Sequence, residues 1–239
     1  MADYEKLCRL WCAPTFATLV FLTAVPVVTA QPSPTPSATT SRAPAPLPVP
    51  SGAAAQRLDA FARAWAAVTA YDATVTVFEQ KDTQVQNVVF NYAFRKPANA
   101  TVHVASGSNA GVTLVWDGGT TVVAHRGSGL AALFKRTLSL HDPQATTIRG
   151  SSIDQLSFGA ILAHADAEAG TLSEVPGDVI DGVATDAVRL SSSTPAANTG
   201  LTREVVELST VTHLPVRVLG YDGETLVRRI DFSNVTLSS

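Results

Sequence analysis

Hydrophobic and polar residues alternate with a period of two along five short stretches in the first half of the chain. These stretches are residues 71–77, 88–94, 98–104, 112–116 and 121–125. Such alternation puts the apolar side chains on one face of a β-strand and the polar ones on the other. Because turn sequences such as Asp117-Gly118-Gly119 separate the stretches at hairpin spacing, we expect an antiparallel sheet with one apolar face.

The apolar positions follow a helical period in three other segments. Ser51 is suited to cap a helix whose apolar residues between 58 and 68 recur about every 3.6 positions. Residues 130–138 have helical spacing after a Gly-Ser-Gly sequence, and Ser152 precedes a third such segment at 153–161. The sequence therefore predicts one helix before the strands and two helices in the middle of the chain.

Strand patterns return from about Val179 to the end of the chain. The clearest is a hairpin in which residues 214–221 turn at Asp222-Gly223 into residues 224–232. Pro215 lacks a backbone donor, so we place it at the start of a strand or at a sheet edge. This order of elements predicts an α+β domain with one large antiparallel sheet and helices on one face. A sheet face too wide for three short helices to cover would leave a hydrophobic hollow.

The first thirty residues have the pattern of a secretory signal peptide. A polar start precedes an almost wholly apolar stretch from Ala13 to Val28, and small residues stand before a cut after Ala30. The alternative is an uncleaved anchor, because the stretch is near the short limit for a membrane span. We expect export to the periplasm or the extracellular space, either free or tethered through residues 13–30. Both cysteines, Cys8 and Cys12, precede the cut, so the mature chain would have no thiol chemistry.

Residues 31–50 are rich in Pro, Ser, Thr and Ala and hold seven of the 14 prolines. Seven missing backbone donors and few apolar side chains exclude helix and sheet, so we expect a disordered linker. Such a segment serves as an extended spacer or as a ligand for an aromatic groove. The ordered domain is then residues 51–239.

Charge and motif content exclude several classes of function. The net charge of −3 offers no basic face, so we expect no nucleic-acid partner. The five histidines lack zinc-site spacing, and nucleophile-elbow, P-loop and Ser-x-x-Lys motifs are absent. The acidic residues between 166 and 181 could hold calcium but lack EF-hand spacing. We therefore expect no enzyme, cofactor or metal, with a hydrolase of unrecognised site as the alternative.

Two stretches carry a family resemblance. Residues 71–104 contain a Lys96-Pro97 corner before a strand with outward polar residues, and residues 204–235 form the hairpin described above. Both stretches, and the Asp-Gly turn within 115–120, resemble the LolA/LppX-type lipoprotein-carrier superfamily. Within it, the layout is most similar to the DUF1571-type envelope proteins. The long proline-rich leader departs from the family pattern and favours a tethered or surface role.

The resemblance implies a curved antiparallel half-barrel of about nine to eleven strands, with helices covering its concave face around an apolar cavity. Members of the superfamily carry or sense lipids and lipoproteins in the cell envelope. We therefore expect an exported, monomeric protein that binds a lipid or the acyl chain of a lipoprotein. The small basic cluster of Arg217, Arg228 and Arg229 could also contact anionic headgroups at a membrane surface.

The candidate cavity residues are apolar positions on the first strands and on the segment after them. For the cavity wall they are Val88, Phe90, Tyr92, Phe94, Val102, Val104, Leu114 and Trp116, and for a lid they are Leu130, Leu133 and Phe134. The same apolar stripe is what any half-buried sheet needs in order to pack on helices. A structural or sensory envelope domain of the same fold, with a filled interior, is therefore the alternative function.

Overall fold

The computed structural model describes residues 52–127, 134–168 and 171–238. The predicted signal peptide and linker, residues 1–50, lie outside the described residues, as does Ser51. Within the described part the helices are α1 (Gly52–Ala67), η2 (Ile153–Leu156, a 3-10 turn) and α2 (Phe158–Ala167). The strands are β1 (Ala70–Lys81), β2 (Gln84–Arg95), β3 (Asn99–Gly107), β4 (Val112–Trp116), β5 (Thr121–Arg126), β6 (Arg136–Ser139), β7 (Leu172–Val175), β8 (Val179–Ile180), β9 (Val183–Ser191), β10 (Arg203–Ser209), β11 (Pro215–Asp222) and β12 (Thr225–Ser238).

The strands form one antiparallel sheet in the order β6-β5-β4-β3-β2-β1-β12-β11-β10-β9-β7, with the short β8 paired to β9. Strand β1 pairs with both β2 and the C-terminal β12, so the two halves of the domain meet in the centre of the sheet. Strands β6 and β7 lie at opposite ends of this order, and the sheet is therefore open. The predicted α+β class is confirmed, and the described residues form twelve strands rather than the nine to eleven expected.

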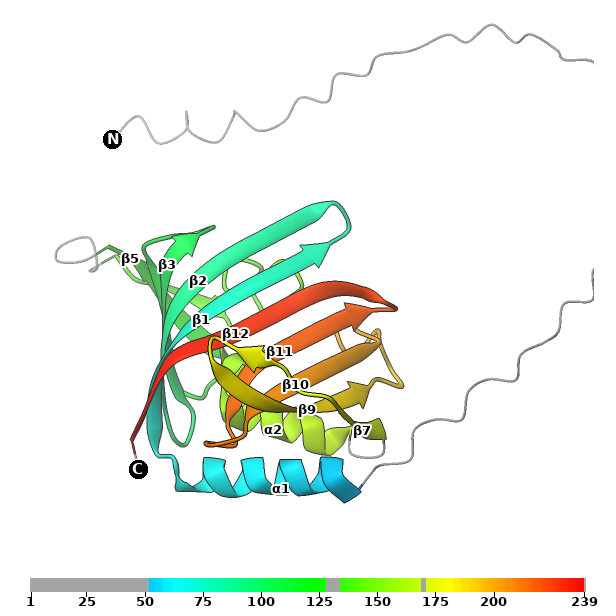
Figure 1. Cartoon of the computed structure of the whole chain (residues 1–239). Helices are drawn as coiled ribbons and strands as arrows, with labels where there is room; N and C mark the ends of the chain where they lie inside the picture. Colours follow the sequence, from blue (N-terminus) through cyan, green and yellow to red (C-terminus); the bar gives the residue numbers. More distant parts are fainter. Residues whose placement is uncertain (1–51, 128–133, 169–170, 239) are drawn as a thin grey trace, which may run out of the picture. The chain divides into compact units, whose positions relative to one another are not determined.

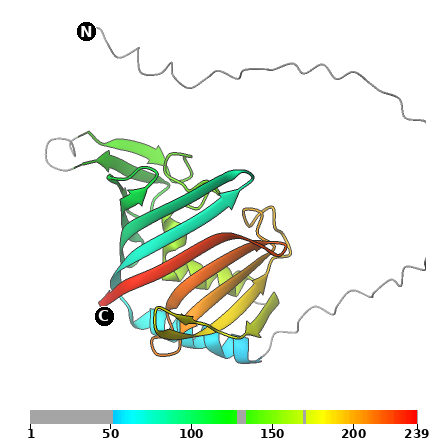
Figure 2. The ribbon, with the colours of Figure 1, turned by 45° about the horizontal axis from the view of Figure 1, so that its top comes forward.

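The sheet curves around the helices, which lie on its inner side (Figure 1). Figure 2 shows α2 behind the central strands and α1 along one end of them. The inner side chains of β1 alternate with outer ones, as the period of two predicts, so that Tyr71, Val75 and Val77 are buried on the inner face of the sheet. Arg57 joins α1 to the edge of the sheet through ion pairs with Glu174 on β7 and Asp186 on β9.

The structure confirms the five predicted strands, the first helix and the final hairpin. The two helices predicted in the middle of the chain differ from what the sequence suggested. Residues 136–138 of the predicted helix 130–138 belong instead to β6, in which Leu138 pairs with Val122 of β5. The segment 153–161 is divided into η2 and α2, because Ser157 is an extended residue whose hydroxyl caps α2 by accepting from Ala160 N–H at 3.1 Å. Pro215 begins β11, as its missing donor requires.

Candidate functional site

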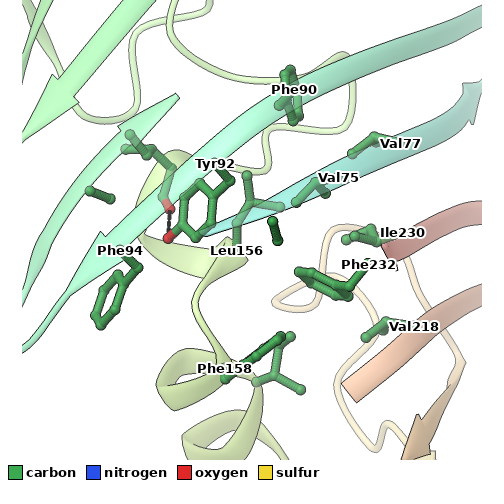
Figure 3. Packing of buried hydrophobic residues seen from close by; sticks show 14 of the residues in the cluster. Val75, Val77, Phe90, Tyr92, Phe94, Leu156, Phe158, Val218, Ile230 and Phe232 are labelled. Carbon is green, nitrogen blue, oxygen red and sulfur yellow. Dashed lines mark hydrogen bonds between the residues drawn. The ribbon is translucent and has the colours of Figure 1, made fainter. Parts of the chain in front are cut away.

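An aromatic cluster fixes the start of α2 on the inner face of the sheet (Figure 3). The rings of Tyr71 and Phe158 are stacked with centroids 4.3 Å apart, and Phe158 N–H donates to Tyr71 Oη at 3.3 Å. Phe232 of β12 packs against Phe158 with centroids 5.2 Å apart. Tyr92 Oη donates to the carbonyl of Ile153 at 3.3 Å, which ties η2 to β2. Aromatic pairs of this kind contribute about 0.5–1.5 kcal/mol each beyond the area that they bury.

Burial raises the pKa of both Tyr71 and Tyr92, because the phenolate form would lose its hydration in the interior. Both hydroxyls therefore stay protonated near neutral pH. Protonation is what the Tyr92 hydroxyl needs in order to donate to Ile153. The tyrosines thus serve as neutral hydrogen-bonding groups in the packing of η2 and α2.

Five of the predicted cavity residues lie together on one side of η2. With Leu156 and Ile153 of η2 they line a small space of about 60 Å³, which we call the central cavity. These five are Val88, Phe90, Val102, Val104 and Leu114, and all are 9% exposed or less. Drug-sized ligands occupy pockets of about 300–1,000 Å³, so the central cavity holds little more than water in this arrangement.

Two other predicted residues, Phe94 and Trp116, line an open groove of about 720 Å³ at the β2–β3 corner, together with Trp65 of α1. We call this the corner groove. Lys96 lies in it with Nζ 4.1 Å from the centre of the Trp65 ring, and its ammonium donates to the Trp65 carbonyl at 2.5 Å. This contact neutralises the C-terminal end of α1, where backbone carbonyls lack helical partners.

The remaining predicted residues have different surroundings. Tyr92 is buried in the aromatic cluster. Phe134 is 84% exposed and lines neither the central cavity nor the corner groove. Leu130 and Leu133 lie outside the described residues.

A larger, partly enclosed space lies on the other side of η2, between α2 and strands β10–β12. It measures about 400 Å³, within the usual range for ligand sites, and we call it the lateral cavity. The sheet register explains its apolar floor, because Val206, Val218 and Ile230 pair across β10, β11 and β12 on the inner face. Leu156 of η2 and Ile161 of α2 add to its apolar lining.

A charged row lies beside the apolar floor, two residues away from it on each strand. Glu204 of β10 pairs with Gly220 of β11, and Gly220 pairs with Arg228 of β12. Because Gly220 has no side chain, the Arg228 guanidinium crosses over β11 and forms an ion pair with Glu204. Asn198 Nδ2 donates to the same carboxylate at 2.9 Å.

His164 of α2 completes this cluster and faces the lateral cavity. Its Nε2 lies 2.5 Å from Glu204 Oε2. Burial alone would raise the pKa of Glu204, but the hydrogen bond from His164 and the charge of Arg228 outweigh it and lower the pKa to about 2. The hydrogen bond to Glu204 raises the pKa of His164 in return. The cavity therefore has an apolar floor and a polar end whose carboxylate stays ionised near neutral pH.

The sequence also has an alternating pattern on the inner face of β10–β12, which the prediction of the cavity residues did not include. Val206, Val218 and Ile230 occupy alternate positions of the last strands in the same way as the candidate residues of β2 and β3. Glu204 interrupts that apolar alternation with a carboxylate on the buried face. A charged residue at an inward position is a sign of a buried polar cluster.

The described residues contain no group of three or more His, Cys, Asp or Glu side chains placed to hold a metal ion. Within the same residues, no helix combines the length and the apolar character that crossing a membrane requires.

No protein-family model matches the chain, and no curated protein matches it. Similar solved structures include an uncharacterized conserved protein from Thermus thermophilus, which is 10% identical with a TM-score of 0.48 over 78% of this chain and 88% of that chain. LprF from Mycobacterium bovis is 16% identical with a TM-score of 0.43 over 80% and 99% of the two chains. A putative outer membrane lipoprotein-sorting protein domain from Vibrio parahaemolyticus is 13% identical with a TM-score of 0.41 over 78% and 94%. Likenesses at this level assign no function, and the likeness to DUF1571-type proteins stays a prediction.

Proposed function

We propose that this chain is an exported, non-enzymatic binding protein that shelters the acyl chain of a lipid or a lipoprotein in the lateral cavity. The observation that carries the proposal is the lateral cavity itself, a partly enclosed space of about 400 Å³ with an apolar floor from the sheet, apolar side chains from η2 and α2, and polar groups at one end. Val206, Val218 and Ile230 form its floor and Leu156 and Ile161 lie among its other walls. An acyl chain is the ligand whose chemistry matches these walls, because each buried methylene contributes about 0.8 kcal/mol.

The polar end of the lateral cavity supports an amphiphile rather than a pure hydrocarbon. His164, Asn198 and Arg228 offer hydrogen-bond donors there, next to the ionised Glu204. A ligand with a hydrocarbon tail and an oxygen-bearing head would place each part against matching groups. The signal-like leader and the proline-rich segment of the sequence support export, with transport of lipid or lipoprotein in the cell envelope as the role.

The central cavity favours a second candidate, a structural or sensory envelope domain with a filled interior. At about 60 Å³ it leaves no room for an acyl chain among Val88, Phe90 and Leu114. In this alternative the side chains of β2–β4 act as ordinary core, and the lateral cavity has no lipid occupant. The two candidates differ in whether lipid accompanies the protein.

The direct test is to purify the full chain after export, extract it with organic solvent and identify bound lipids by mass spectrometry. The proposal predicts a lipid with an acyl chain in about stoichiometric amount. Protein that is folded and free of lipid, and that takes up no acyl lipid from vesicles, would favour the filled domain.

Two variants at neighbouring positions test whether the lipid binds in the lateral cavity. Ala197 is an exposed residue that lines the lateral cavity, whereas Ala196 beside it is exposed and does not line it. A Trp at position 197 would fill the cavity mouth, so we expect Ala197→Trp to reduce retained lipid about tenfold. Ala196→Trp adds the same side chain to the same loop and should leave retention unchanged. Equal retention by both variants would exclude the lateral cavity as the site.

A further inference from the structure

Leu156 borders two separate spaces on the inner face of the sheet. It lines the central cavity together with side chains of β2–β4, and it lines the lateral cavity together with side chains of β10–β12. Figure 3 shows it between the side chains of β2 and those of Val218 and Ile230. Leu156 is therefore part of the wall that separates a space of about 400 Å³ from one of about 60 Å³.

Several contacts hold this wall in place. Leu156 is the last residue of η2 and is 5% exposed. Tyr92 Oη anchors the first residue of η2 through the Ile153 carbonyl, and Phe158, two residues after Leu156, is stacked on Tyr71. The backbone on both sides of Leu156 is thus fastened to the sheet, so its side chain has little freedom to move aside for a ligand.

We propose that Leu156 determines the length of acyl chain that the lateral cavity accepts, by closing the end of the cavity that faces β2–β4. This inference rests on the proposed function. A chain that enters beside His164 and Arg228 runs along Val206, Val218 and Ile230 until its end meets Leu156. Removing this side chain joins the two cavities and lets a longer chain continue toward Val88 and Phe90.

The expected measurement is a break in the dependence of affinity on chain length. Each methylene that enters an apolar wall strengthens binding about fourfold, so affinity rises steeply while the lateral cavity is being filled. Once the chain end reaches Leu156, further methylenes remain in water and the affinity levels off. The position of this break reports the length of the cavity.

The test measures displacement of the uncharged fluorophore N-phenyl-1-naphthylamine from the full chain by octanoate, laurate, palmitate and stearate. Leu156→Ala is compared with Ile161→Ala, which removes the same number of carbons from the wall of the lateral cavity. Ile161 does not line the central cavity, so it is not part of the wall that the two cavities share. We expect Leu156→Ala to move the break to longer chains and to raise the affinity for the longest chain about tenfold relative to laurate. Ile161→Ala should leave the break where it is in the wild type.

Equal chain-length profiles for the two variants would overturn the inference, as would a wild-type profile without a break. Both of those results leave the proposed function intact, whereas a wild-type chain that binds none of the four acids contradicts the proposed function itself. Circular dichroism checks that each variant is folded. If Leu156→Ala is unfolded, Leu156→Val, which removes one carbon, is expected to shift the break in the same direction by a smaller amount.

Discussion

The Nε2 atom of His164 on α2 lies 2.5 Å from Oε2 of Glu204 on β10, across the polar end of the lateral cavity. This hydrogen bond raises the pKa of His164 above its ordinary 6.5. The charged imidazolium therefore stabilises the folded state fully below pH 6.5, and this contribution to the free energy of unfolding disappears as the pH rises through the raised pKa. Glu204 behaves in the opposite way, because its pKa is lowered from 4.5 to about 2 and its contribution is lost as the pH falls through that range. We predict that the pair stabilises the fold most between pH 4.5 and 6.5, measured as the free energy of unfolding in urea at a series of pH values.

His164→Gln separates this pair from the other titrating groups. Gln keeps a donor toward Glu204 but does not titrate, so the loss of stability above pH 6.5 should become smaller than in the wild type. His141→Gln, at an exposed loop residue, is the matched control and should keep the wild-type profile. Protonating Glu204 at low pH should lower the free energy of unfolding by on the order of 3 kcal/mol, as the shift of its pKa from 4.5 to about 2 implies. Water screens this interaction little, because the Glu204 side chain is only 3% exposed. A His164→Gln profile identical to that of the wild type would contradict this account of the pair.

Gly220 is predicted to be essential for the charged row, because Arg228 reaches Glu204 across it. A Cβ at this position would lie 3.0 Å from both Cδ atoms of Leu201 and 3.1 Å from Cβ of Arg228. We expect Gly220→Ala to destabilise the fold by about 1–3 kcal/mol through overpacking and a displaced Arg228. Gly52→Ala, where the added carbon would meet no atom within 4 Å apart from its chain neighbours and its own helix backbone, is the control. Wild-type stability of Gly220→Ala in urea denaturation would show that Arg228 does not depend on the gap at β11.

Two phenylalanines, one buried and one exposed, should respond very differently to truncation. Phe158 has no exposed surface and stacks on Tyr71, so Phe158→Ala is predicted to destabilise the fold by about 3–5 kcal/mol. Phe134 is 84% exposed, and Phe134→Ala should change stability by less than about 0.5 kcal/mol. Thermal unfolding of the two variants measures the contrast. A large loss in Phe134→Ala would indicate that this residue covers the sheet in solution, as the sequence led us to expect.

The strands could be predicted where a long alternating pattern met a buried face. Apolar and polar residues alternate through 71–77 and 88–94, which is long enough to identify a strand, and these segments lie within β1 and β2. The pattern failed at β6, because a strand of four residues is too short to show a period. The apolar residues between 130 and 138 fit a helical spacing equally well, and only the pairing of Leu138 with Val122 decides for a strand.

The sequence predicted only part of the candidate site, because alternation identifies inward-facing residues but not the cavities between them. The sequence identifies which residues face the interior, and seven of the eight wall candidates are buried. It does not reveal how the interior is divided, because that depends on where η2 crosses the sheet. Leu156 leaves about 60 Å³ beside Val88 and Phe90 and about 400 Å³ beside Val218 and Ile230. The break between η2 and α2, which Ser157 produces by its extended conformation, determines this position and has only a local capping signal in the sequence.

Placement of an acyl chain by nuclear magnetic resonance tests the central claim most directly. Stearate carrying a nitroxide near its methyl end is added to the full chain with isotope-labelled Val, Leu and Ile methyl groups. A chain that lies in the lateral cavity will broaden the methyl signals of Val206, Val218 and Ile230, and the signals of the exposed Val179 and Val211 will stay sharp. Broadening confined to Val179 and Val211, or no broadening at equimolar stearate, would contradict the account.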